Sequence, residues 1–123
     1  MKIKDRVTSF RNAFNGMAIL LSSQTNARLH LIATITVVAL GYYFQISSNE
    51  WILITIAIAM VFSAELFNTA IERLADAIDL EYNPKIKAIK DLAAGGVLIT
   101  ALGAAIIGIF LFGSRIIQVL SFY

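Results

Sequence analysis

The segment from Trp51 to Ala64 contains no charged side chain and is followed at once by Glu65. Uncharged apolar segments are typical of the membrane interior, where an acidic side chain at a helix centre costs roughly 2.5–3.5 kcal/mol. The chain is 59% hydrophobic and 15% charged over 123 residues, which is too apolar for a soluble domain with so little interior. The sequence therefore predicts an all-α membrane protein, and it makes Glu65 a candidate functional residue.

Three apolar segments are close to the length of about 20 residues that a helix needs to cross a bilayer. They cover residues 29–46, 51–71 and 91–112. The second is expected to continue as a helix to about Ile78, because no Gly or Pro interrupts it before Pro84. A single domain of three transmembrane helices over residues 1–123 follows from this pattern.

The regions outside these spans have different characters. Residues 1–26 carry apolar side chains at helical spacing opposite polar ones, which predicts an amphipathic helix lying in the membrane interface. Residues 79–90 are expected to form a loop, in which Asn83 and Pro84 are a turn signal that ends the long helix. All Lys and Arg residues except Arg115 lie before the first span or between the second and third. The positive-inside rule therefore puts the N-terminus and residues 73–90 in the cytoplasm.

A stripe of polar side chains follows one face of the second helix as it leaves the membrane. Its members are separated by three or four residues, the spacing of one helical face, and they are Glu65, Asn68, Glu72, Asp76 and Asp79. Glu65 lies deepest and is either a general base or a buried carboxylate that serves helix packing. Glu72 lies nearer water, where a carboxylate can bind Mg²⁺ together with phosphate oxygens, and Asn68 can orient either neighbour.

Other polar residues allow two interpretations each. Lys90 and Asp91 are either the basic flank and first turn of the third span or a phosphate-binding pair. The segment from Glu81 to Asn83 is either a solvated loop or a contact for a nucleotide base or ribose. His30 makes either an interfacial hydrogen bond or a catalytic contact. The chain has no Cys, which excludes disulfides and thiolate metal sites, and no Walker A sequence, so that a nucleotide site must be built differently.

Two runs of residues resemble the signature of the prokaryotic diacylglycerol kinase family, which also includes the undecaprenol kinases. They are Glu65 to Glu72 with Asp76 after it, and Lys90 to Leu98. The resemblance implies a domain-swapped homotrimer in the bacterial cytoplasmic membrane. It also implies transfer of the γ-phosphoryl group of MgATP to the primary hydroxyl of a membrane lipid alcohol, with no role for nucleic acid.

The resemblance also assigns roles to single residues. Glu65 is implied to be the general base and Asn68 a catalytic support, with Lys90 and Asp91 binding phosphates. The nucleotide is implied to contact Arg6, or Arg11 as second choice, and also Gln24, Glu72, Glu81, Tyr82 and Asn83. Metal ligation falls to Glu72 and to Gln24, although relatives carry an acidic residue where Gln24 stands, which puts a second metal ion in doubt.

The acceptor lipid and two other functions stay open. The pattern Asn26-x-Arg28-x-His30 is more similar to the undecaprenol branch than to the diacylglycerol branch. A channel or transporter is the first other function, but its path needs polar groups near the midplane of several helices, and the first and third spans offer no matching charge. The second is a non-catalytic membrane subunit of this fold, inactivated by Gln24.

Overall fold

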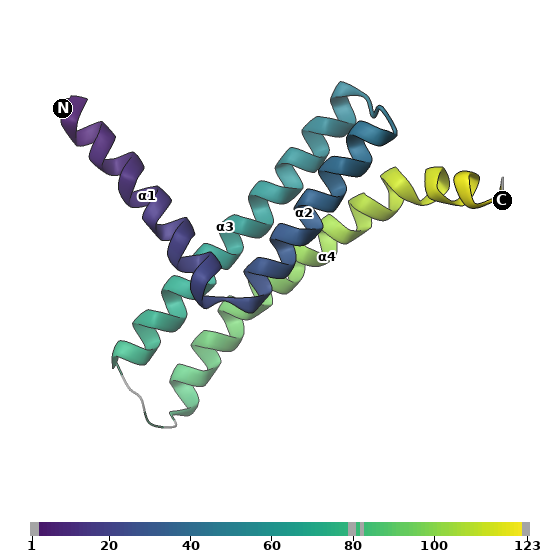
Figure 1. The fold of residues 1–123 in the computed structure, drawn as a ribbon. Helices are drawn as coiled ribbons and strands as arrows, with labels where there is room; N and C mark the ends of the chain where they lie inside the picture. Colours follow the sequence, from purple (N-terminus) through teal and green to yellow (C-terminus); the bar gives the residue numbers. More distant parts are fainter. Residues whose placement is uncertain (1–2, 79–80, 82, 122–123) are drawn as a thin grey trace.

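The computed structural model of the chain describes residues 3–78, 81 and 83–121, and these form four α-helices. The helices are α1 (Ile3–Ser23), α2 (Thr25–Tyr43), α3 (Ser48–Ile78) and α4 (Pro84–Leu120). In Figure 1, α2, α3 and α4 run alongside one another, whereas α1 leaves this bundle at a steep angle. The all-α architecture predicted from the sequence is confirmed.

Two of the described helices, α3 and α4, are long and apolar enough to cross a membrane. The helix through the uncharged segment continues to Ile78, as its lack of Gly and Pro predicts. The expected span over residues 29–46 falls mainly on α2, which is not among the helices that meet this test. Its first turns carry Asn26, Arg28 and His30, which lower its apolar character. A third transmembrane helix therefore stays a prediction.

The connection between α3 and α4 is shorter than the predicted loop over residues 79–90. Residues 84–90 are the first turns of α4, which begins before the expected boundary at 91 and continues past 112. Pro84 occupies the first turn of this helix, where its fixed φ and missing N–H are tolerated. The side chain of Asn83 caps the helix by accepting a hydrogen bond from the backbone N–H of Lys85 at 3.0 Å. α3 thus ends at Ile78, before this turn signal, and Asn83 and Pro84 mark the start of α4.

The turn between α2 and α3 packs tightly at one end of the bundle. Gly41 lies under the ring of Trp51, and a Cβ atom at position 41 would stand 2.7 Å from that ring. The buried residues Ile46, Ile54 and Phe112 form a small core beside this turn. Their contacts join α4 to the α2–α3 hairpin at this end.

The chain breaks between α1 and α2 at Gln24, whose backbone is extended with φ −112° and ψ 118°. On either side of the break, Leu20 and Ala27 are completely buried. In the first half of α1, the apolar side chains of Val7, Phe10 and Phe14 are exposed, as expected of a helix that faces a membrane surface. Gln24 makes no side-chain cap for α2, so its amide can reach α3 instead.

Candidate active site

The candidate site is centred on α3, in the region where the polar stripe begins. Glu65 is 2% exposed, and Asn68 and Thr69 are buried beside it in the next turn. A buried carboxylate is costly unless neighbouring groups compensate its charge, so a Glu at this depth calls for a specific partner or a specific role.

Glu72 receives a hydrogen bond at each of its carboxylate oxygens. The amide nitrogen of Asn68 donates to Oε1 at 3.1 Å, and the amide nitrogen of Gln24 donates to Oε2 at 3.0 Å. Asn68 lies one helical turn away on α3, whereas Gln24 comes from the α1–α2 break. The structure therefore brings together three of the residues that the sequence pointed to, from two separate parts of the chain.

The carboxylate of Glu65 is approached by His30 from α2. Nε2 of His30 lies 3.3 Å from Oε1 of Glu65. Oε1 nevertheless accepts no hydrogen bond among the described residues. The sequence alone does not place His30 at Glu65, since only the packing of α2 on α3 brings the two side chains together.

The predicted phosphate-binding residues form ion pairs beyond Glu72. Lys90 of α4 pairs with Asp76 of α3, and Asp91 pairs with Lys87 one turn away on α4. All four side chains are substantially exposed to solvent. Such pairs contribute about 0–1 kcal/mol each, so that an incoming phosphate group can displace them at small cost.

Several predicted contacts lie outside this cluster. Arg6 is exposed near the start of α1, whose N-terminal end points away from the other helices (Figure 1). Glu81 is exposed between α3 and α4, and Asn83 caps α4. Asp79 and Tyr82 lie outside the described residues. The nucleotide roles of Arg6, Glu81, Tyr82 and Asn83 stay predictions.

The Gln24–Glu72 pair is compatible with a magnesium ion, although no group of three or more Asp, Glu, His or Cys side chains gathers as a metal site within the described residues. Rotation of the Gln24 amide by half a turn would exchange its nitrogen and oxygen. Its oxygen would then lie about 3.0 Å from Oε2 of Glu72. Two ligand oxygens of an octahedral Mg²⁺ are about 2.8–3.0 Å apart when its bonds are about 2.0–2.1 Å. Two of six ligand positions can thus come from these residues.

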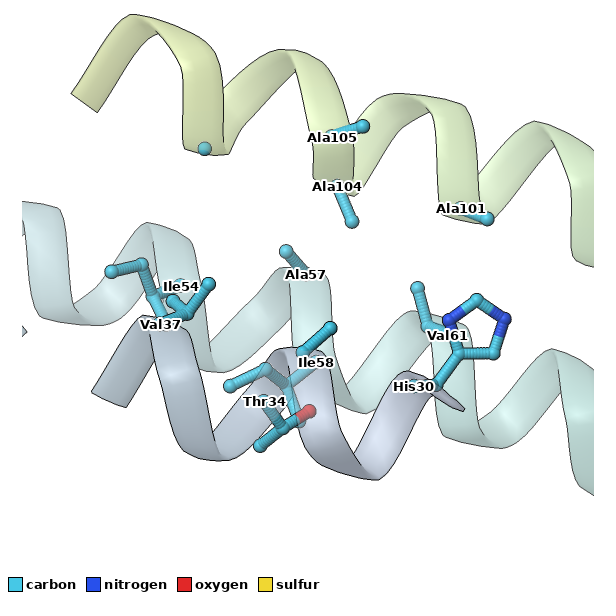
Figure 2. Close-up of a pocket in the computed structure, with 12 residues that line it drawn as sticks. His30, Thr34, Val37, Ile54, Ala57, Ile58, Val61, Ala101, Ala104 and Ala105 are labelled. Carbon is cyan, nitrogen blue, oxygen red and sulfur yellow. The ribbon is translucent and has the colours of Figure 1, made fainter. Parts of the chain in front are cut away.

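A cavity of about 320 Å³ lies between α2, α3 and α4, with His30 in its wall. Its walls are apolar apart from His30 and Thr34, and α4 contributes small side chains, of which Figure 2 labels Ala101, Ala104 and Ala105. That these side chains face a cavity depends on how α4 is rotated against α2 and α3, which local spacing does not reveal.

Comparison with known proteins identifies the group to which the chain is related. The family model described as prokaryotic diacylglycerol kinase matches residues 11–112. An undecaprenol kinase from Bacillus subtilis (strain 168) is 38% identical over 104 residues, which is 85% of each chain. A diacylglycerol kinase from Synechocystis sp. is 30% identical over 103 residues, covering 83% of this chain and 59% of that protein.

Proposed function

Because the chain belongs to the prokaryotic diacylglycerol kinase family, we propose that it transfers the γ-phosphoryl group of ATP to the primary hydroxyl of a membrane lipid alcohol. The observation that carries this proposal is the buried carboxylate of Glu65, which lies on the same face of α3 as the hydrogen-bonded Asn68 and Glu72. A proton acceptor within apolar surroundings and a metal-ligating carboxylate nearer water are the two groups that this reaction requires.

The proposed reaction begins with the lipid hydroxyl next to Glu65. The carboxylate of Glu65 accepts the hydroxyl proton while the oxygen attacks the γ-phosphorus in line. The bond from the γ-phosphorus to the β–γ bridging oxygen breaks, ADP leaves, and the proton later passes from Glu65 to water. Asn68 supports this step by holding the carboxylate of Glu72 in one orientation.

The remaining predicted residues act on the nucleotide. Lys90 would bind the transferring phosphate oxygens after it separates from Asp76, and Asp91 would orient it. Glu72 and Gln24 would hold Mg²⁺, which when bound neutralises negative charge on the phosphates. Arg6, Glu81, Tyr82 and Asn83 would contact the nucleotide itself. Three copies would form the active homotrimer, with the site at the cytoplasmic face of the membrane.

We expect undecaprenol to be the acceptor. The relative of 38% identity that the chain matches over 85% of both lengths is an undecaprenol kinase. The relative named as a diacylglycerol kinase is less similar, at 30% identity. Diacylglycerol is therefore the alternative acceptor.

The test is transfer of a radioactive γ-phosphate from MgATP by the purified protein in mixed micelles, with undecaprenol and diacylglycerol offered separately. We expect label in undecaprenol, and Glu65→Gln should lower the rate by at least about 100-fold because it removes the proton acceptor. The variant should keep its helical circular dichroism spectrum and its oligomeric state. If neither lipid were labelled, the proposed activity would be contradicted. Near-normal transfer by Glu65→Gln would contradict the role of this residue.

A further inference from the structure

We propose that His30 is a positioning residue for the general base: its imidazole pairs with one carboxylate oxygen of Glu65 and leaves the other oxygen to accept the proton of the lipid hydroxyl. This inference rests on the proposed lipid kinase reaction and adds to it a residue from a different helix. His30 comes from α2, whereas the polar stripe belongs to α3.

The first support for this pairing is that one carboxylate oxygen of Glu65 lacks a hydrogen bond. Its Oε1 is buried and accepts no hydrogen bond within the part of the chain that the structure describes. Buried polar atoms are nearly always hydrogen-bonded in native proteins, so this oxygen calls for a donor. Asn68, the nearest polar member of the stripe, donates to Glu72 instead. Nε2 of His30 lies 3.3 Å from Oε1, and a small rotation of the ring would align its N–H with this oxygen.

The loose geometry of this pair agrees with a catalytic contact. Hydrogen bonds between catalytic groups are often long without substrate and shorten only in the reacting complex. An oxygen held by an N–H from a second helix would fix the carboxylate in one rotamer before the lipid hydroxyl arrives. A fixed orientation of the proton acceptor lowers the barrier because less motion is needed in the transition state.

His30 has a second possible role, which the test must separate from the first. Its ring lies at one end of the cavity between α2, α3 and α4, near Val61 and Ala101 (Figure 2). It could therefore serve only as a filler of the cavity wall. The two roles depend on different properties of the side chain, since the wall needs the volume of the ring whereas the pairing needs its N–H group.

Two substitutions distinguish these roles by steady-state kinetics. His30→Phe keeps a ring of similar size without a donor, and His30→Gln keeps an N–H near the place of Nε2. Loss of a hydrogen bond to a charged group should lower kcat of His30→Phe by about 10- to 100-fold, with KM for MgATP unchanged. His30→Gln should retain most of kcat. Full kcat in His30→Phe, or loss in His30→Gln alone, would overturn the proposal.

A spectroscopic measurement tests the pairing without any activity. His30 is the single histidine of the chain, so the ¹⁵N signals of histidine-labelled protein in micelles belong to this ring alone. Glu65→Gln should change the Nε2 chemical shift, because it replaces a carboxylate acceptor by a neutral amide. Glu50→Gln removes a carboxylate in the first turn of α3, paired there with Arg115, and should leave the signal in place.

The lipid phosphorylation assay and the ¹⁵N measurement distinguish failure of the proposed function from failure of the His30–Glu65 pairing. If the wild-type protein phosphorylated no lipid, the proposed function would be wrong, and the ¹⁵N shift would still report whether His30 and Glu65 are paired. If lipid were phosphorylated but Glu65→Gln left the Nε2 shift unchanged, the pairing would be refuted while the kinase activity stood.

Discussion

At the scale of single residues, the Gln24–Glu72 contact would set the charge that the proposed metal site presents to a cation. The amide of Gln24 donates to Oε2 of Glu72 and so compensates this carboxylate without adding charge. A second carboxylate at position 24 would repel Glu72 when no cation is present and would attract a cation more strongly. The charge of the ligand set is one of the properties that tune the affinity of divalent ions.

The substitution Gln24→Glu should therefore have opposite effects with and without magnesium. Without Mg²⁺ it should lower the free energy of unfolding by about 1–3 kcal/mol, because a hydrogen bond to a charged group is replaced by repulsion. With Mg²⁺ this loss should disappear. The Mg²⁺ concentration for half-maximal activity should fall by roughly tenfold, or about 1.4 kcal/mol. Denaturant titrations followed by circular dichroism and Mg²⁺ titrations of lipid phosphorylation measure these effects.

A matched control for this change is Gln24→Met, which keeps the length of the side chain but offers neither a donor nor an oxygen ligand. It should lower stability without Mg²⁺ because the hydrogen bond to Glu72 is lost, and, unlike Gln24→Glu, it should not recover this loss when Mg²⁺ is added. Equal Mg²⁺ dependence of the wild type and Gln24→Glu would show that position 24 lies away from the cation.

The site was predictable where it follows one helix and unpredictable where it joins two. Glu65, Asn68 and Glu72 share a face because their spacing matches the helical repeat, and any uninterrupted helix would align them. Gln24 was assigned to the site only through the resemblance to a family, because its contact with Glu72 depends on the bend after α1. The contact of His30 with Glu65 depends on how α2 packs against α3, and no local pattern encodes this.

At the scale of elements, the close approach of α2 and α3 depends on Gly41. A Cβ atom at this position would stand 2.7 Å from the ring of Trp51, which cannot bend away as a flexible chain would. The ring of Trp51 also contacts Tyr42, with 5.0 Å between ring centroids. The absent side chain is therefore what lets the hairpin close.

Gly41→Ala should destabilise the protein by about 1–3 kcal/mol, because inserted volume forces neighbouring groups apart. Unfolding with a denaturing detergent, followed by circular dichroism, measures this loss of stability. Trp51 is the single tryptophan, so its fluorescence reports directly on the hairpin.

Gly16→Ala is the matched control on α1, where a new Cβ would meet no atom within 4 Å. There alanine should stabilise the helix by about 0.5–1 kcal/mol. Equal effects at the two positions would contradict the role of the Gly41–Trp51 contact.

The long uninterrupted α3 was predictable, whereas the start of α4 was not. Absence of Gly and Pro is sufficient to indicate that a strongly apolar helix continues, and α3 does so to Ile78. A proline is compatible both with the end of one helix and with the first turn of the next. The choice depended on the cap by Asn83, a contact between a side chain and the backbone that composition does not reveal.

At the scale of the whole molecule, the charge distribution predicts how the protein lies in the membrane. The α2–α3 turn and the α3–α4 connection are at opposite ends of α3 (Figure 1). Basic residues gather near the second of these ends, as the positive-inside rule expects of a cytoplasmic side. Large apolar side chains of α4, such as Ile109 and Phe110, are exposed and are expected to face lipid or other copies of the chain in the proposed trimer.

Single cysteines test this orientation, because the chain has none of its own. Asn49→Cys, at the α2–α3 end, should react with a membrane-impermeant maleimide added to intact cells. Lys85→Cys, at the start of α4, should react only in inside-out vesicles. Both positions are exposed, so access across the membrane alone should decide the result. The reverse labelling pattern would refute the predicted orientation.

The continuity of α3 has a consequence for how the protein would respond to the thickness of a bilayer. Its 31 residues extend about 46 Å at about 1.5 Å per residue, which exceeds the roughly 30 Å of a bilayer's hydrocarbon core. A helix in one piece answers a change in bilayer thickness by tilting or shifting as a whole, rather than by bending at the surface. With α3 as a transmembrane helix, the height of Glu65 relative to the lipid head groups would therefore depend on acyl chain length. Through this hydrophobic mismatch, the membrane that supplies the acceptor would also tune the rate at which it is phosphorylated.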